Sequence, residues 1–191
     1  MLKTAVLSLA FVLLAGVAQA QTKPQTQPPA QDAAPAATPS PLPGGASSIQ
    51  ESYEDWRVLC SVANNAKQCT IQQVQLDTKT GQRVLAVELV PNGDGGASGN
   101  LIMPFGLQLD AGVALALDAG ASGKPLPFKT CIASGCLVPL TLSANTIAAL
   151  RAGKQLKLTT RSIDVNAKPL VFPVSLNGFG AALDRAVAIL K

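Results

Sequence analysis

Histidine is absent from this sequence of 191 residues, and its absence removes several classes of enzyme. Ser-His-Asp and Cys-His nucleophiles need an imidazole base, and the common zinc hydrolase sites need histidine ligands. Acidic residues are also few, and Asp110, Asp118 and Asp164 each lie near a turn. A solvated or turn-forming carboxylate is the ordinary interpretation there. We therefore expect no enzymatic activity and no cofactor.

Aromatic residues make up only 4% of the chain, and no run of lysine and arginine interleaved with aromatics occurs. The net charge of +4 is a mild excess spread along the sequence, so nucleic-acid binding has little support. What the chain has in quantity is Leu, Val, Ala and Ile, which are core residues for strands.

The first twenty residues have the three-part pattern of a secretory signal peptide. Lys3 is the only charge before an apolar run over residues 5–17, and Ala18 and Ala20 are the small residues of a cleavage site. The run is short for a membrane span, which takes about 20 helical residues; an uncleaved anchor is the alternative. Cleavage would remove Lys3, lower the charge from +4 to +3 and leave no transmembrane segment. The expected location is the periplasm, the outer envelope or the exterior.

Residues 21–50 are rich in Pro, Ala and Gln and poor in large apolar side chains. Such a segment cannot bury enough surface to offset its ordering entropy, so we expect a disordered linker. A peptide for a proline-binding partner is the alternative. Residues 51–191 make up a single domain by length.

Alternation of apolar and polar residues dominates from residue 53 onward. The segments with this pattern are 53–60, 82–90, 112–118, 154–161 and 169–176. A period of two with turn residues between segments is typical of half-buried strands. No long helix separates them, which favours an antiparallel β-sandwich or barrel.

Two segments have other patterns. Ser143 can cap a short helix near 143–152, with Gly153 as its stop. In 177–191, Phe179, Leu183 and Val187 recur at helical spacing, which predicts a C-terminal helix packed on the sheet.

Cys60, Cys69, Cys131 and Cys136 would meet an oxidising compartment after export, where an even count favours disulfides. Four cysteines allow three connectivities, and the sequence does not formally choose among them. Each neighbouring pair flanks turn-forming residues, so we expect Cys60 to pair with Cys69 and Cys131 with Cys136. The chain lacks histidine for a zinc site, and neither pair has the two-residue spacing of a thioredoxin-like redox motif.

The glycine-rich stretch at residues 91–100 lacks the Lys-Ser/Thr ending of a P-loop, and no helix pattern follows it. Asn92, Asp94 and Asn100 could ligate calcium, although a single carboxylate would bind weakly. We expect a flexible hairpin loop instead.

The order of motifs carries a family resemblance over roughly residues 53–188. The motifs are DWRVLC, MPFGLQLDAGVALALD, CIASGC, SANTIAALRAGKQLKLTTR and VSLNGFGAALDRAV. In this order they resemble the invasion-associated locus B family of bacterial envelope proteins. The resemblance implies an immunoglobulin-like β-sandwich with paired local disulfides outside the cytoplasm. It also implies a link to host-cell invasion in some members, and it carries over no catalytic residue.

Two functional hypotheses follow. The first is a non-enzymatic envelope protein that binds a macromolecule of the envelope or host surface, with Tyr53, Glu54 and Trp56 as the candidate surface because aromatic anchors dominate binding energy. A core position for Trp56 is the competing interpretation. The second is a periplasmic small-ligand or metal-responsive module that uses the glycine-rich loop.

Overall fold

The protein is described by a computed structural model of residues 42–164, 166 and 168–191. The predicted signal peptide, residues 1–20, and the linker up to residue 41 lie outside the described residues. The strands are β1 (Ser48–Tyr53), β2 (Trp56–Ala63), β3 (Ala66–Leu76), β4 (Arg83–Pro91), β5 (Ala97–Met103), β6 (Ala114–Leu117), β7 (Thr130–Ile132), β8 (Gly135–Leu142), β9 (Gln155–Thr160) and β10 (Leu170–Ser175). The helices are α1 (Ala144–Ala152) and α2 (Phe179–Leu190), with 3-10 turns η1 (Pro43–Gly45) and η2 (Leu109–Ala111).

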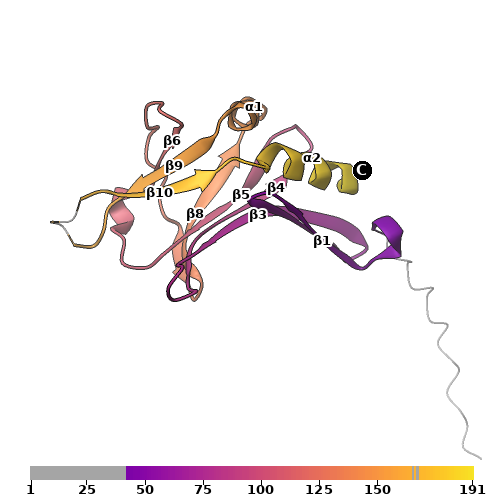
Figure 1. The fold of residues 1–191 in the computed structure, drawn as a ribbon, viewed down its shortest axis with the longest axis horizontal. Helices are drawn as coiled ribbons and strands as arrows, with labels where there is room; N and C mark the ends of the chain where they lie inside the picture. Colours follow the sequence, from indigo (N-terminus) through magenta and orange to yellow (C-terminus); the bar gives the residue numbers. More distant parts are fainter. Residues whose placement is uncertain (1–41, 165, 167) are drawn as a thin grey trace, which may run out of the picture. The chain divides into compact units, whose positions relative to one another are not determined.

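The strands form two antiparallel sheets (Figure 1). The large sheet has seven strands in the order β1-β2-β3-β4-β5-β8-β7, and the small sheet has three in the order β10-β9-β6. The first five strands form a meander of hairpins, because each short turn lets the next strand pair with the last. The prediction of a mostly β, antiparallel sandwich with two helices is confirmed. Its division into seven and three strands differs from the four and three of an immunoglobulin constant domain.

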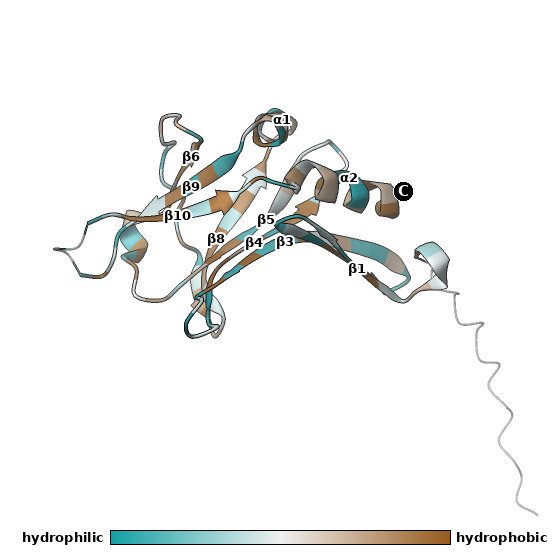
Figure 2. Cartoon of the chain, in the orientation of Figure 1, coloured by the Kyte–Doolittle hydropathy of each residue, from teal (hydrophilic) through white to brown (hydrophobic). Residues whose placement is uncertain are grey.

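The core lies between the sheets and under α2. In β2 the predicted face of Trp56, Val58 and Cys60 is buried. In β4 the predicted Leu85, Val87 and Leu89 are buried, and Ala86 between them is buried as well, so the alternation is interrupted there. Figure 2 shows α2 as mostly hydrophobic with one hydrophilic band. The hydrophobic face of α2 packs on β2 and β3, so the helix covers the part of the large sheet nearest β1.

Both helices begin and end close to their predicted limits. The Ser143 hydroxyl accepts a hydrogen bond from the Thr146 amide at 3.3 Å and caps α1. Arg151 near the end of α1 forms a bidentate ion pair with Asp184 of α2, with a shortest N–O distance of 2.6 Å. The two helices are therefore joined at their exposed sides.

Strand β10 is joined to the large sheet through side chains. The amide of Gln75 donates to the Pro173 carbonyl at 2.6 Å, and that of Gln73 donates to the Ser175 carbonyl at 2.8 Å. The indole N–H of Trp56 also donates to the Ser175 carbonyl, at 2.9 Å. These side-chain hydrogen bonds hold the two sheets together along β10, although no backbone hydrogen-bond ladder links β10 to the large sheet.

The ordered domain begins earlier than the sequence indicated. Strand β1 starts at Ser48, and Leu42 is buried in the core, so both precede the boundary expected at residue 50. Leu42 is a large apolar residue among prolines and small residues, and its burial offsets the ordering entropy of this short stretch.

Candidate functional site

Two disulfides each cross-link one hairpin of the large sheet, and β4 and β5 lie between these hairpins. Cys60 pairs with Cys69 across β2 and β3, and Cys131 pairs with Cys136 across β7 and β8, with Cα–Cα distances of 4.1 Å and 3.9 Å. This is the expected connectivity, in which each cysteine pairs with its neighbour in the sequence. Cys60 and Cys69 are buried against α2, whereas β7 is exposed along its length. All four sulfurs are used in cross-links, so none is a free thiol.

Trp56 lies in the core and not on the outer surface of the domain. Its side chain is 1% exposed, and its ring meets the Phe179 ring edge-on at a centroid distance of 5.1 Å. The indole N–H is satisfied by the Ser175 carbonyl. The competing interpretation, with Trp56 in the core, is the one that the structure adopts.

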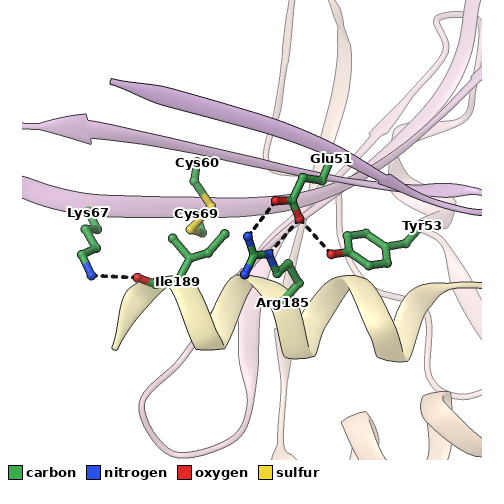
Figure 3. The surroundings of a disulfide bond; sticks show 7 residues. All are labelled: Glu51, Tyr53, Cys60, Lys67, Cys69, Arg185 and Ile189. Carbon is green, nitrogen blue, oxygen red and sulfur yellow. Dashed lines mark hydrogen bonds and ion pairs between the residues drawn. A yellow bond between two sulfur atoms is a disulfide. The ribbon is translucent and has the colours of Figure 1, made fainter. Parts of the chain in front are cut away.

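Tyr53, three residues before Trp56, belongs to a polar cluster with Glu51 of β1 and Arg185 of α2 (Figure 3). Its hydroxyl donates to Glu51 at 2.8 Å, and Arg185 donates to both oxygens of the same carboxylate at 2.8 Å. Arg185 and Tyr53 hold the pKa of Glu51 below its ordinary value. Burial, followed by the bond to Glu51, raises the pKa of Tyr53. The cluster fastens α2 to edge strand β1, close to the buried Cys60–Cys69 disulfide.

Replacing Glu51 with glutamine should destabilise the protein at neutral pH and have little effect in acid. The ordinary pKa of this carboxyl is 4.5, and the folded-state pKa is lower. A carboxyl with a lowered folded-state pKa stabilises the fold above its unfolded-state pKa and loses that contribution as pH falls through the folded-state value. The difference in Tm between wild type and Glu51→Gln should be present at pH 7 and shrink progressively below about pH 4.5.

Thermal unfolding followed by circular dichroism between pH 3 and pH 7 checks this. Glu54→Gln, at an exposed carboxyl on the adjacent turn, is the matched control and should show a smaller difference at pH 7. A Glu51→Gln difference that grows toward acid would contradict the assignment.

Glu54 is exposed at the β1–β2 turn, with a positive φ of 50°. Gly178, before α2, packs against this turn so closely that a Cβ there would lie 2.0 Å from the Tyr53 carbonyl oxygen. Of the three residues of the candidate surface, Glu54 is therefore exposed, Tyr53 is half-buried in an ionic cluster and Trp56 is in the core.

The glycine-rich loop is an ordered β4–β5 turn. Asp94 accepts the Gly96 amide at 2.8 Å, and the Asn92 amide N–H donates to the Gly96 carbonyl at 2.9 Å. The Asn92 side chain donates to Ser98. These groups shape the turn. Over the described residues, no group of three or more His, Cys, Asp or Glu residues could hold a metal ion.

An exposed apolar surface lies at the loop end of the sandwich, and the sequence did not single it out. Phe105, Leu109 and Ile163 are 61%, 46% and 70% exposed; we call these three residues the loop-end surface. Phe105 and Leu109 lie in the connection between β5 and β6, and Ile163 lies between β9 and β10. Exposed large apolar side chains that gather in one region often mark interaction sites.

The backbone under the loop-end surface is paired across the two connections. The Ile163 amide donates to the Gly106 carbonyl at 2.8 Å, and the Gln108 amide donates to the Arg161 carbonyl at 2.9 Å. Between these two hydrogen bonds, the buried Leu107 forms an isolated antiparallel bridge with Ser162. The exposed side chains are thus held on ordered backbone, which lowers the entropy that binding must offset.

No helix in the part of the chain that the structure describes is long and apolar enough to cross a bilayer.

The family profile, the curated relatives and the solved structure that match this chain all carry the name of the same protein family. The profile of the family described as "Invasion associated locus B (IalB) protein" matches residues 56–187. The chain is 45% identical over 150 residues to an invasion protein B homolog of Brucella abortus, covering 78% of this chain and 86% of the homolog. It is 35% identical over 152 residues to invasion protein B of Bartonella bacilliformis, covering 78% and 81%. The crystal structure of invasion associated protein B from Bartonella henselae is similar, with TM-score 0.69, 37% identity and coverage of 74% and 96%.

Proposed function

The chain belongs to the invasion associated locus B protein family, and from this premise we propose that it is an exported, non-enzymatic protein of the bacterial envelope. It binds a protein of the envelope or of a host-cell surface and contributes to interaction with host cells. The names of the relatives, which describe invasion proteins, support this role. The two disulfides support a location in the periplasm or beyond, where thiols are oxidised.

The observation that carries the proposal is the loop-end surface. Phe105 and Ile163 together expose two large apolar side chains on paired backbone, and each is more than half accessible. Exposed large apolar side chains that lie together often mark interaction sites, which supports a partner that covers Phe105 and Ile163. Exposed Glu54 at the β1–β2 turn stays a second candidate for contact.

Replacing Phe105 and Ile163 with serine together should abolish capture of the partner and leave the fold intact. Both side chains are exposed, so the double variant should unfold within about 0.5 kcal/mol of wild type per substitution. The measurement is crosslinking of the oxidised, immobilised domain in envelope extracts and host-surface preparations, followed by mass spectrometry.

The matched control is Leu76→Ser with Val90→Ser, which removes two exposed apolar side chains outside the loop-end surface. The control should capture the same partner as wild type. Equal capture by both double variants, or no capture by wild type, would refute the proposed role of this surface.

A further inference from the structure

A cavity of about 420 Å³ lies between the two sheets beside α1. Both sheets contribute to its walls: β2, β4 and β8 from the large sheet, and β6, β9 and β10 from the small one. The start of α2 and one side of α1 complete it. Its lining residues are Trp56, Val87, Leu89, Leu115, Leu117, Leu140, Leu142, Asn145, Thr146, Ala149, Leu150, Leu156, Val174, Leu176 and Phe179.

The lining carries no charged side chain. Leucine is its commonest residue, and the polar groups are those of Asn145 and Thr146 on α1. A site of this composition cannot compensate the desolvation of a charged or strongly polar ligand, so its interior selects an aliphatic one.

The cavity has a deep end and a mouth. Trp56, Val174 and Phe179 are buried at the deep end, whereas Asn145 and Ala149 are exposed on α1. Leucines of β6, β8 and β9 between these limits are half-buried: Leu115, Leu117, Leu142 and Leu156. The mouth is therefore at α1, where an amide and a hydroxyl can meet a polar head group while the apolar portion lies inside.

The volume sets the size of the occupant. It falls within the range of roughly 300–1,000 Å³ that small-ligand sites have. Scaling from a dry cavity of about 150 Å³ that holds the six carbons of benzene gives room for roughly sixteen carbons. One long, unbranched chain has this carbon number and can enter by a single mouth.

The chain's own N-terminal arm does not match the cavity. Residues 21–41 contain no Leu, Ile, Val, Met or aromatic residue, so they cannot supply the aliphatic surface that the lining requires. An external aliphatic ligand is needed.

We propose that this cavity binds a single long acyl chain, which enters at α1 and leaves its head group beside Asn145 and Thr146. The site is distinct from the loop-end surface, and it stands whether or not the proposed partner binding does. A free fatty acid and the acyl chain of a phospholipid share this chemistry.

The only tryptophan of the chain, Trp56, lines the cavity and reports on its occupancy. Fatty acids brominated at mid-chain, titrated below their micelle concentrations into oxidised, delipidated protein, should quench Trp56 fluorescence saturably. Affinity should rise about fourfold for each added methylene. The increase should level off near roughly sixteen carbons, when the cavity is full. An absence of saturable quenching, or affinity independent of chain length, would overturn the proposal.

Ala149→Phe and Ala148→Phe make a matched pair on α1. Ala149 lines the cavity and Ala148 does not, yet both are exposed, so both variants should fold with similar Tm. Ala149→Phe should weaken acyl binding at least about tenfold because the ring occupies the mouth, while Ala148→Phe should bind like wild type. Equal binding by the two folded variants would refute the assignment of the ligand to this cavity.

Brominated lysophospholipid in a parallel titration distinguishes the two sources. Quenching by fatty acid alone assigns a free acid, and quenching by both assigns an acyl chain whose head group projects past α1. The loop-end variant Phe105→Ser with Ile163→Ser should retain acyl binding, so failure of one proposal is distinguishable from failure of the other.

Discussion

Replacing Trp56 with alanine should lower the free energy of unfolding by about 3–5 kcal/mol, the usual range for a fully buried aromatic residue. The side chain is 1% exposed, packs edge-on against Phe179 and donates to the Ser175 carbonyl. Its loss would enlarge the cavity between the sheets and remove one of the side-chain bonds that attach β10. Urea denaturation followed by far-ultraviolet circular dichroism measures the change.

Trp56→Phe separates packing from hydrogen bonding. The phenyl ring keeps contact with Phe179, and the Ser175 carbonyl retains its bond from Gln73 at 2.8 Å. We expect a loss of about 1–2 kcal/mol, clearly smaller than for alanine. A Trp56→Ala loss under about 1 kcal/mol would show that the sandwich does not depend on this contact.

Removing the Cys60–Cys69 disulfide as the double alanine variant should cost about 3 kcal/mol or more. Loop entropy alone gives about 2.7 kcal/mol for a ten-residue ring, and truncating two buried side chains adds to it. The double alanine variant of Cys131 and Cys136 opens a six-residue ring in which Cys136 is buried and Cys131 is exposed, and it should cost about 2 kcal/mol.

Denaturant unfolding of both double variants in one buffer, with urea midpoints and slopes compared, checks this order. Each variant is the control for the other, because both remove one hairpin cross-link. The reverse order would indicate that burial beneath α2 adds nothing to the first disulfide.

Local pattern predicted most of the architecture. Buried residues such as Val58 and Leu89 alternate with more exposed neighbours because one face of each strand is buried, and this period of two is visible within a few residues of sequence. The disulfide pairing was predictable for the same reason, since each cysteine lies directly opposite its partner across one hairpin.

Features that depend on distant segments were missed. The Ser175 carbonyl that accepts the Trp56 indole N–H lies 119 positions away in the chain, and no local pattern indicates that contact. Leu42 reaches the core from a stretch with the composition of a linker. The loop-end surface is made of residues from two separate loops, and the walls of the cavity come from six strands. Neither feature can be predicted from one stretch of sequence, because both depend on how the sheets pack.

The attachment of β10 bears on self-association. An edge strand with free carbonyls and amides is a template on which another chain can add a strand. On β10 the outward carbonyls of Pro173 and Ser175 are already occupied by glutamine and tryptophan side chains, and Pro173 has no amide to offer. At Pro173 and Ser175 this border of the small sheet therefore offers few free groups to an incoming strand, which disfavours intermolecular β-pairing there.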